Sequence, residues 1–470
     1  MRSELNSRNT SGIFTDNYIM DNKLIDPSLL TKSAISDKDL KIIKEQIDAD
    51  FDKMKTGEKI AINLGTNNAH YLPPPTVVFN FLGFKYGIPD TIKKLENIGV
   101  KPLDIPRTSR YDLQNKGVGK RTYKKYIDWV IDLPISLLDN IIEGRNPKLD
   151  ASAKTSSNAF HWITFLIGVI NSMQPDDELR PEYIPLIEFI EYRCDTEVDM
   201  QQRTSNRDDY ESLSRSDTHI WWPQLAKPFF AKHTVFTSDI LDSLDSFMVN
   251  GSVPYDLTVT EKNTLYKNLL RLKFDFILAS ISHYEVGIII SRCPDTESMR
   301  AMTPLTCHAI TKYISHDESR TCFDLALQKL KDWCSETESG MSWREIASYI
   351  PVDNIDPNNA SPTRHIDKQY SRLKDWRKGK NLPSNELLEL FTTNIAESMG
   401  SHSEGDSLFI LCRITIGLDK TLSNLVKEWS KDIGSKSQVS VIWKDVLSHY
   451  HEDYYLHYLN QHIAKIEKTT

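Results

Sequence analysis

The stretch QYSRLKDWRKGKNLPSNELLELF, residues 369–391, decides how the C-terminal half of the chain is expected to fold. Leu373 and Trp376 are three residues apart, so they lie on one face of the helix that this pattern predicts, and basic side chains occupy the other face. Gly379 and then the pair Pro383–Ser384 indicate where this helix ends and the next one begins. The stretch therefore predicts two packed helices, the first of which has a basic outer face.

This basic face stands out because the chain as a whole is acidic. The 470 residues are 39% hydrophobic and 26% charged, which is ordinary for a soluble protein, and the net charge is −8. Between Arg364 and Lys380, however, seven basic residues stand against two acidic ones. Since an acidic surface repels phosphate, such a local basic island is where a nucleic acid would bind.

We expect a cytoplasmic protein without a membrane segment, a metal or a cofactor. The first 22 residues contain no apolar core, so no secretory signal is predicted. Residues 274–290 are apolar but include Asp275 and Glu285, which favours a buried helix over a membrane span. The six cysteines form no CxxC pair and are expected to be reduced, buried thiols. A zinc site is not favoured, because the usual ligand spacing is missing; the residues considered for it are Cys307, His308, Cys322 and Cys334.

The apolar periodicity predicts a mainly α, multi-helical fold with a small β element near the N-terminus. From residue 91 onward, apolar residues recur at spacings of three and four. Residues 59–64 and 76–84 are β-like runs on either side of the breaker YLPPP, and residues 37–54 contain a possible helix. The predicted divisions are a polar segment at 1–55, a first domain with short strands at 56–146, a helical middle domain at 147–320, a domain containing the opening stretch at 321–400, and C-terminal helices at 401–470.

Two polar stretches are expected to be loops, and two aromatic-rich stretches are expected to be core. The loops are residues 194–219 and 351–364, and the first is long enough to suggest a mobile or partner-binding segment. The aromatic run at residues 219–230 is expected to be buried. The same is expected of the final helix, whose histidines are His449, His451, His457 and His462.

Further signals precede the opening stretch. Residues 323–334 predict a first helix, and Ser342 followed by Glu345 predicts a capping box at the start of a second. The resulting order of four helices resembles the Cro/repressor-type (XRE) helix-turn-helix. The matching residues are Glu345-Ile346-Ala347 in the second helix, Leu373-x-x-Trp376 in the third, Gly379 at its end, Pro383-Ser384 before the fourth, and Leu387-Leu388 within it.

The resemblance implies that the third helix lies in the major groove of DNA. By position, the residues that would face the bases are Gln369, Tyr370, Ser371 and Arg372. The residues that would face phosphates are Lys374, Lys378 and Lys380. The chain departs from the family by roughly sixteen extra residues between Ala347 and Trp376, so a loop replaces the usual tight turn. The alternative is a degenerate, structural module whose charged face is simply solvated.

A second basic island, KGVGKRTYKK at residues 116–125, holds five basic residues and no acidic one. It does not fit a phosphate-binding P-loop, because Gln114 stands where that motif needs Gly and Arg121 where it needs Ser or Thr. The wider stretch 91–131 resembles the helix-hairpin-helix of the C-terminal domain of the bacterial RNA polymerase α subunit. The matching residues are Leu95, Ile98-Gly99-Val100, Leu103, Leu113, Gly117-x-Gly119-Lys120, Thr122 and Ile127.

This resemblance implies a grip on the nucleic-acid backbone. Two glycines allow a tight turn before a helix, which leaves backbone N–H groups free to hold a phosphate oxygen. The residues expected to contact the DNA backbone are Lys116, Gly117, Gly119, Lys120, Arg121 and Lys124. Similar hairpins also join proteins to each other, so protein docking or a purely structural role is the alternative.

We find no catalytic signature: the sequence has no GxSxG and no HExxH. A metal-dependent nuclease could use carboxylates, but the acidic clusters lie in loop-like sequence; they are Asp176, Asp177, Glu178, Asp195, Glu197, Asp199, Asp208 and Asp209. We therefore predict a non-enzymatic protein that binds DNA, or a structured RNA, in transcription regulation or in a mobile-element or antiviral-defence assembly. The first alternative is a scaffold subunit that binds a protein partner through the helical middle domain, and the second is a nuclease.

Overall fold

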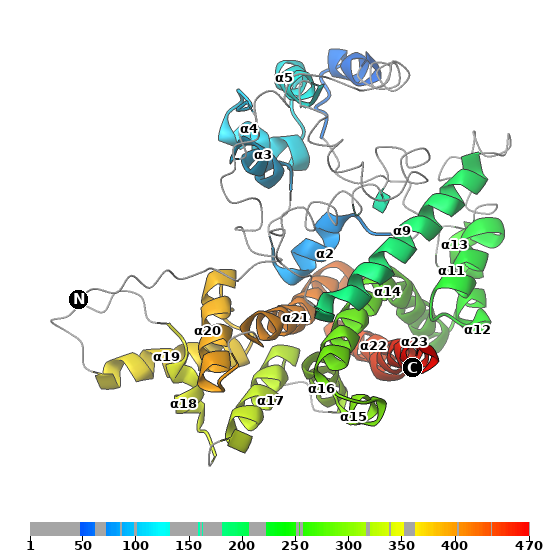
Figure 1. Cartoon of the computed structure of the whole chain (residues 1–470). Helices are drawn as coiled ribbons and strands as arrows, with labels where there is room; N and C mark the ends of the chain where they lie inside the picture. Colours follow the sequence, from blue (N-terminus) through cyan, green and yellow to red (C-terminus); the bar gives the residue numbers. More distant parts are fainter. Residues whose placement is uncertain are drawn as a thin grey trace. The chain divides into compact units, whose positions relative to one another are not determined.

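The computed structural model is built from helices (Figure 1). It describes residues 48–61, 72–84, 87–97, 101–131, 158–159, 162, 181–205, 222–250, 253, 257–315, 320–337, 340–351, 362–401, 404–433 and 435–469. This part of the chain contains no strand, only one isolated bridge between Ile60 and Val118. The prediction of a mainly α fold is confirmed.

Helices of very different length follow one another along the chain. Residues 48–55 are also helical. The α-helices are α2 Pro75–Leu82, α3 Ile88–Asn97, α4 Arg107–Asn115, α5 Lys120–Ile131, α9 Ile184–Ser205, α11 Lys227–His233, α12 Ser238–Asp242, α13 Asp245–Asn250, α14 Val259–Arg292, α15 Thr296–Ala301, α16 Leu305–Ser315, α17 Cys322–Thr337, α18 Trp343–Ser348, α19 Pro362–Arg377, α20 Asn385–Ser398, α21 Gly405–Ile433, α22 Lys436–Ser448 and α23 His457–Thr469. A 3₁₀ turn spans Pro181–Tyr183, and π-helical turns span Trp222–Ala226 and Tyr450–Leu456.

The chain divides into two compact units. Unit 1 comprises residues 1–80, 84–179 and 191–202, and unit 2 comprises residues 81–83, 180–190 and 203–470. In unit 1, the helical residues 48–55 share one apolar core with α3, α4 and α5. The buried members of this core are Met54, Ile88, Ile92, Leu103, Ile105, Leu113, Val118, Tyr123 and Trp129.

The prediction of a β-like run at residues 76–84 is wrong, because Pro75–Leu82 form helix α2. Pro75 at the first helical position has a backbone angle that suits a helix start. Phe79 and Leu82 are three residues apart and both are buried, so packing at helical spacing overrides the β propensity of the paired valines. Of the other run, the structure describes residues 59–61, where Ile60 makes its bridge, and residues 62–64 lie outside the described residues.

The expected loop at residues 194–219 is also wrong for its first part, because α9 continues to Ser205. Its buried residues fall at helical spacing: Arg193, Cys194, Glu197 and Met200. Glu197 accepts a hydrogen bond from the Leu72 N–H at 3.4 Å. Two of these buried residues, Arg193 and Glu197, are charged, so the apolar pattern of the sequence did not reveal the buried face of this helix. Residues 206–219 of this stretch lie outside the described residues.

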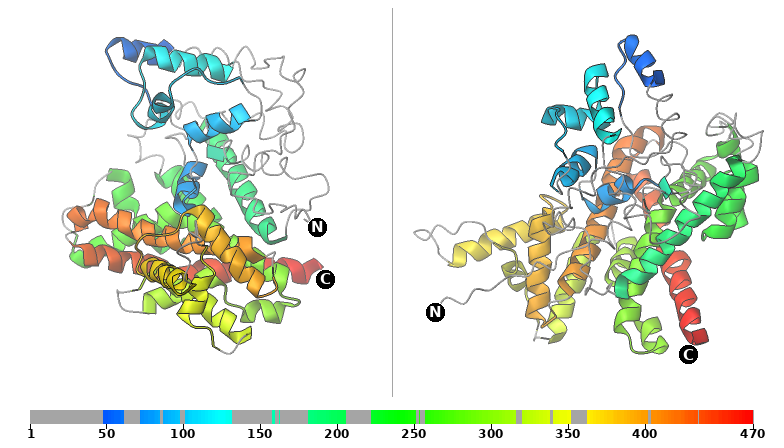
Figure 2. Two further views of the ribbon diagram at one scale, coloured as in Figure 1. Left: turned by 90° about the vertical axis from the view of Figure 1, so that its left-hand side faces the viewer. Right: turned by 45° about the horizontal axis from the view of Figure 1, so that its top comes forward.

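Unit 2 is organised around α14, the 34-residue helix that contains the apolar run of residues 274–290. Among the described residues α14 is the one helix long and apolar enough to cross a membrane, but 83% of that window is buried inside the protein. Helices α22 and α23 pack against it, and α16 packs against α17 and α22 (Figure 2). Most of the run that the sequence predicts to be a buried helix therefore lies inside the protein.

The described Trp, Tyr and Phe rings of the two aromatic-rich stretches are buried, as expected. Of the four histidines, His462 is buried, His449 and His451 are half-buried, and His457 is exposed. Trp222, Phe229 and Phe230 lie inside unit 2, and so do Tyr450 and Tyr454 of the second stretch. The six cysteines are free and buried, which confirms the expectation of buried thiols. Of the stretch at residues 158–173, which helical periodicity also marks, nearly all lies outside the described residues.

Candidate nucleic-acid interfaces

The opening stretch of sequence lies within four consecutive helices of unit 2, α17 to α20, here called the C-terminal helix set (Figures 1 and 2). Its first helix, α17, begins at the Asp419 carboxylate of α21, which accepts the backbone N–H groups of Cys322 and Phe323 at 2.9 and 3.0 Å. Because a carboxylate at a helix N-terminus satisfies otherwise unpaired donors, Asp419 fixes where α17 starts.

The apolar residues predicted to hold the set together are buried. Leu373 and Trp376 of α19 have no exposed surface, and the Trp376 ring packs edge-to-face on Phe391 of α20 with centroids 5.5 Å apart. Ile346, Ala347, Ile350 and Leu388 are equally buried, whereas Leu387, the other matching leucine of the fourth helix, is half-buried. The capping box predicted at the start of the second helix is confirmed: Ser342 and Glu345 bond to each other's backbone N–H groups.

The end of the third helix also lies where the sequence indicates. After Arg377 the chain turns at Gly379, whose φ of +66° suits a residue without a side chain. The carbonyl of Asp375 accepts the N–H groups of Lys378 and Lys380 there. Ser384 then caps α20 by accepting the N–H of Leu387. The loop expected at residues 351–364 is wrong for its last three residues, because α19 begins at Pro362, where a proline suits the first helical position. Residues 352–361 lie outside the described residues.

The predicted base-facing residues of α19 differ in what they contact. Ser371 and Arg372 are exposed, and one Arg372 guanidinium nitrogen lies 3.5 Å from the Pro351 carbonyl. Gln369 instead donates from its amide to the carbonyls of Ser348 and Ile350, at 3.1 and 2.6 Å. This amide ties α19 to the end of α18. A bidentate contact with adenine needs the same donor, so Gln369 would first have to release these bonds.

Three exposed lysines on α19 and the following turn are the ones predicted to contact phosphate: Lys374, Lys378 and Lys380. A fourth cation, Arg377, is used inside the protein. It bonds to Asp324 of α17 at 2.6 Å, and its guanidinium lies 3.8 Å from the centroid of the Trp343 ring. The basic outer face is therefore made by the lysines and Arg372, whereas Arg377 joins the third helix to the first and second.

Sequence reasoning missed Arg344 of α18. Its side chain pairs with Asp367 of α19 at 2.9 Å, and its guanidinium lies 5.2 Å from the centroid of the Tyr370 ring. Lys374 approaches the same ring at 4.3 Å. Two cationic side chains therefore lie close to the ring of Tyr370, a residue that the resemblance places next to the bases. The signal in the sequence is weak, because Arg344 and Tyr370 are far apart in the chain.

The second candidate interface is the turn Gly117–Gly119 of unit 1, between α4 and α5. Gly117 has a φ of +72°, and a side chain there would meet the Lys59 and Ile60 backbone at about 3 Å. The N–H and C=O of Val118 both bond to Ile60. A glycine is therefore needed at position 117 because the backbone of residues 59–60 comes too close for a side chain. Around Gly119, by contrast, no atom lies within 4 Å of an added Cβ.

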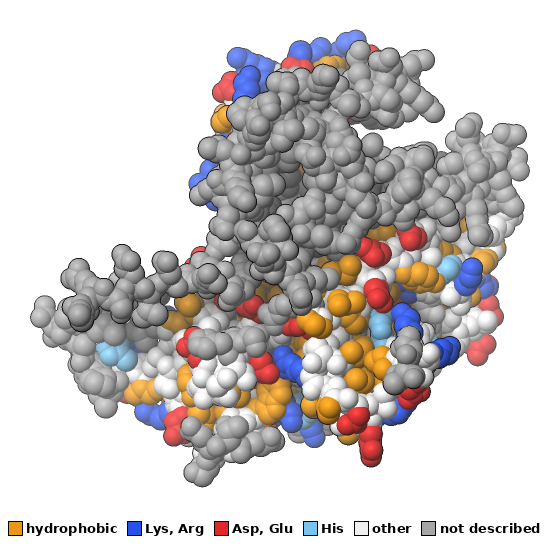
Figure 3. All heavy atoms as spheres, viewed as in Figure 1, with side chains coloured by type: hydrophobic (Ala, Val, Ile, Leu, Met, Phe, Trp, Pro, Cys, Tyr) orange, Lys and Arg blue, Asp and Glu red, His pale blue; other side chains and the backbone are white. Residues whose placement is uncertain are grey.

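The basic residues next to this turn are exposed: Lys116, Lys120, Arg121 and Lys124. Figure 3 shows Lys and Arg side chains at the top of the view, where α5 and the helical residues 48–55 lie. Lys120 lies 5.1 Å from the centroid of the Phe51 ring. Lys124 pairs with Asp128, and the neighbouring Lys125 pairs with Asp104, each within 3 Å.

Polar contacts hold the helices around this turn. Arg110 of α4 makes two 2.8 Å bonds to the Glu96 carboxylate of α3, and Glu96 also accepts the Leu103 N–H. The hydrogen bond from Arg110 is the main reason that the pKa of Glu96 is lowered. Gln114, where a P-loop would need Gly, accepts the Ile88 N–H at 3.0 Å and so caps α3. Of the matching residues, Ile98, Gly99 and Val100 lie outside the described residues.

The other site candidates give no catalytic arrangement in the part of the chain that the structure describes. No group of three His, Cys, Asp or Glu residues is placed to hold a metal there. Glu197 is buried and Asp195 is exposed on α9. The remaining acidic candidates lie outside the described residues or have side chains that do; they are Asp176, Asp177, Glu178, Asp199, Asp208 and Asp209.

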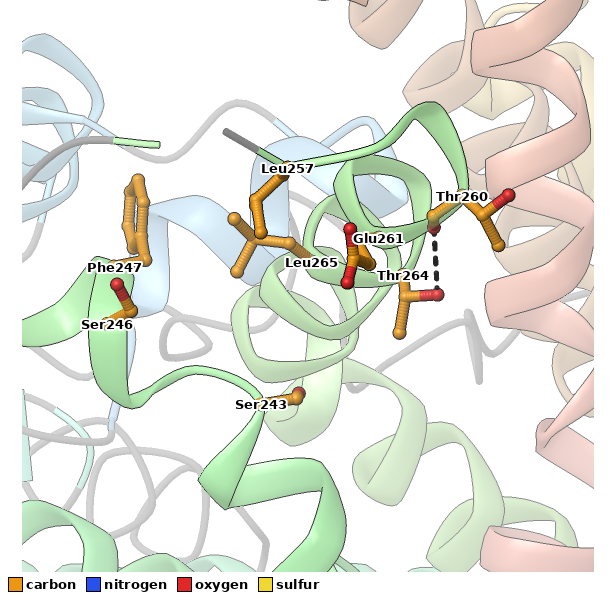
Figure 4. A pocket seen from close by; sticks show the side chains of 8 residues that line it. All are labelled: Ser243, Ser246, Phe247, Leu257, Thr260, Glu261, Thr264 and Leu265. Carbon is orange, nitrogen blue, oxygen red and sulfur yellow. Dashed lines mark hydrogen bonds between the residues drawn. The ribbon is translucent and has the colours of Figure 1, made fainter. Parts of the chain in front are cut away.

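A hollow of about 390 Å³ lies in unit 2 between α13 and the start of α14. Figure 4 shows Phe247 on one side and Leu257 and Leu265 on the other, with hydroxyl groups around them. Its one carboxylate, Glu261, already bonds to Thr258 in the capping box of α14. This lining offers no acid–base pair.

Comparison of the chain with protein-family models, with curated proteins and with solved structures finds no match.

Proposed function

We propose that the protein binds nucleic acid, DNA in the first place, through the basic outer face of α19. The observation that carries the proposal is the division of this helix into two faces. Leu373 and Trp376 are fully buried, while Ser371, Arg372, Lys374 and Lys378 are exposed together on the other side. A helix whose back is fixed by packing can present its basic front in one orientation, which recognition in the major groove requires.

The turn Gly117–Gly119 would add a second contact, to the phosphate backbone. Gly119 lies open at the start of α5, and four exposed cations surround the turn. Backbone N–H groups at a helix N-terminus favour an anion. Two weak contacts on one chain raise the overall affinity. We place such a regulatory or defence-assembly protein in the cytoplasm and assign it no enzymatic activity.

The proposal is tested first by binding to random duplex DNA, single strands and structured RNA over a salt series. Fluorescence anisotropy of the full chain should show an affinity whose logarithm falls linearly with the logarithm of salt concentration. Absence of binding at low salt to every probe would refute the proposal.

Replacing Arg372 by Ala should weaken binding to the preferred duplex by about 1–3 kcal/mol and relax the base preference. The reason is that a guanidinium on the exposed face can contact a guanine edge with two bonds. The preferred duplex is selected from a random pool with the wild-type protein. Lys427→Ala removes an exposed charge from α21, which lies outside the four helices of the set, and is the matched control. An unchanged base preference in Arg372→Ala would exclude Arg372 as a reader of bases.

Replacing Lys120 by Ala should weaken binding to all sequences alike and reduce the magnitude of the salt slope by about one. A phosphate contact carries no sequence information, so the base preference should stay as in the wild type. The control is Lys125→Ala, because Lys125 is half-buried and its ammonium is held by two bonds to Asp104, to the carboxylate at 2.6 Å and to the backbone carbonyl at 2.9 Å. A larger effect from Lys125→Ala than from Lys120→Ala would contradict the assignment.

A specific observation favours one rival, a scaffold subunit whose helix set is structural. The Gln369 amide already bonds to two backbone carbonyls, so one of the four predicted base contacts is engaged within the protein. In that case a stoichiometric protein partner should co-purify, and none of the nucleic-acid probes should bind.

A further inference from the structure

Tyr370 brings two cations from different helices together. Arg344 belongs to α18 and Lys374 to α19, one turn after Tyr370. The Arg344 guanidinium and the Lys374 ammonium lie 5.2 and 4.3 Å from the centroid of the same ring. An aromatic ring attracts cations to its faces, so it offsets part of the repulsion between two neighbouring positive charges. The ring is half-buried, while both cations are exposed.

Asp367 lies beside this pair and neutralises one of its members. Its carboxylate is 2.9 Å from the Arg344 guanidinium, and the two side chains are 60% and 57% exposed. An ion pair in water at such exposure is weak and exchanges partners readily. A guanidinium has five N–H donors arranged in a fork that fits phosphate as well as carboxylate. The Asp367 carboxylate therefore binds the Arg344 guanidinium, which could bind a phosphate instead.

From these contacts we infer that Arg344 and Lys374 form a two-cation grip for the phosphate backbone of a nucleic acid, held in place by Tyr370 and opposed by Asp367. The inference rests on the function proposed above and adds a contact from α18 to it. Phosphate displaces Asp367 from Arg344 when the nucleic acid binds. Tyr370 is then a positioning residue, whose ring rather than its hydroxyl matters, and not a reader of bases.

The decisive variant is Asp367→Asn, which frees Arg344 without changing the size of the side chain. We expect it to bind random duplex DNA about two- to tenfold more tightly than the wild type, since it removes a carboxylate that competes with phosphate for Arg344. Glu428→Gln, which removes an exposed charge from α21, is the control for the change in net charge and should alter affinity by less than about twofold. Arg344→Ala should weaken binding and reduce the magnitude of the salt slope by about one.

The double variant Arg344→Ala/Asp367→Asn tests whether Asp367 acts through Arg344. If it does, Asp367→Asn should give no gain beyond that of the control when Arg344 is already absent. Tyr370→Phe should bind within about twofold of the wild type, whereas Tyr370→Leu should bind about two- to fivefold more weakly, because only phenylalanine keeps the ring.

The outcomes separate this inference from the proposed function. A wild-type protein that binds duplex DNA, together with an Asp367→Asn variant whose affinity matches the Glu428→Gln control, would overturn the grip and leave the proposed function standing. A Tyr370→Phe variant as weak as Tyr370→Leu would overturn the positioning role and return Tyr370 to the base-contacting residues. A wild type that binds no nucleic acid would overturn both.

Discussion

Replacing Trp376 by Ala is expected to destabilise the C-terminal helix set by about 3–5 kcal/mol. The side chain has no exposed surface and packs edge-to-face on Phe391 of α20. Its removal leaves a large cavity between α19 and α20, together with the loss of an aromatic pair. Because α19 carries the basic face, we expect nucleic-acid binding through that face to be lost along with the fold of the set.

The effect should be local, so it is best measured by hydrogen–deuterium exchange of peptides from α17 to α20, with urea unfolding of the full chain beside it. Leu390→Ala is the matched control, because Leu390 lies on α20 beside Phe391 but is 51% exposed. It should change stability by less than about 0.5 kcal/mol. A Trp376→Ala protein with wild-type exchange in all four helices would mean that Trp376 does not hold the set together.

Local signals in the sequence sufficed for the C-terminal helix set. The Ser342–Glu345 capping box, the spacing of Leu373 and Trp376, and the stop at Gly379 each act within one or two helical turns. A capping hydrogen bond or a glycine with positive φ depends on its immediate neighbours, and so does its pattern in the sequence. The structure has each of these features where the pattern places it.

Packing with distant residues accounts for the misses in the fold. The β-branched residues of α2 favour a strand by propensity, but the helix buries Phe79 and Leu82. In α9 the buried stripe includes Arg193 and Glu197, two residue types that a hydrophobic pattern counts as exposed. Neither the helical structure of α2 nor the burial of charged residues in α9 follows from the local sequence. Burial of a charged side chain depends on partners that only the folded chain brings close.

The position of the basic face on α19 was predictable from the sequence, but the contacts of its side chains were not. The basic face of α19 follows from helical spacing. That Gln369 would bond to the end of α18, and that Arg344 would lie at Tyr370, depends on how two helices cross. Crossing angles are set by packing over the whole contact, so a single helical pattern does not determine them.

Replacing Glu285 by Ala should destabilise unit 2 by about 3–5 kcal/mol. Glu285 of α14 is completely buried, and its carboxylate accepts three hydrogen bonds. Two come from the backbone N–H groups of Thr306 and Cys307 at the start of α16, at 2.8 and 3.2 Å, and one from the Tyr450 hydroxyl at 2.7 Å. Alanine would leave these buried donors without their acceptor and would add a cavity. Thermal unfolding at fixed protein concentration measures the loss.

Glu285→Gln separates the role of shape from the role of charge. Burial raises the pKa of Glu285 from 4.5 to about 7, against the opposing effect of its hydrogen bonds. A carboxyl whose pKa is raised by folding stabilises the folded state fully below the unfolded pKa, and this contribution is lost as the pH rises through the folded pKa. The wild type should therefore lose about 3 kcal/mol from this group between pH 4.5 and pH 8.

Glutamine fills the same space and does not titrate, so the Glu285→Gln protein should lack this part of the pH dependence. Asp419, whose pKa burial also raises to about 7, stays in both proteins and cancels in the comparison. Urea unfolding of both proteins at pH 5 and pH 8 gives the difference directly. The stability of Glu285→Gln relative to the wild type should rise by about 2–3 kcal/mol between these pH values. A constant difference would mean that Glu285 is ionised at both pH values. The N–H groups at the start of α16 and the Tyr450 hydroxyl would then stabilise a buried carboxylate rather than a buried carboxylic acid.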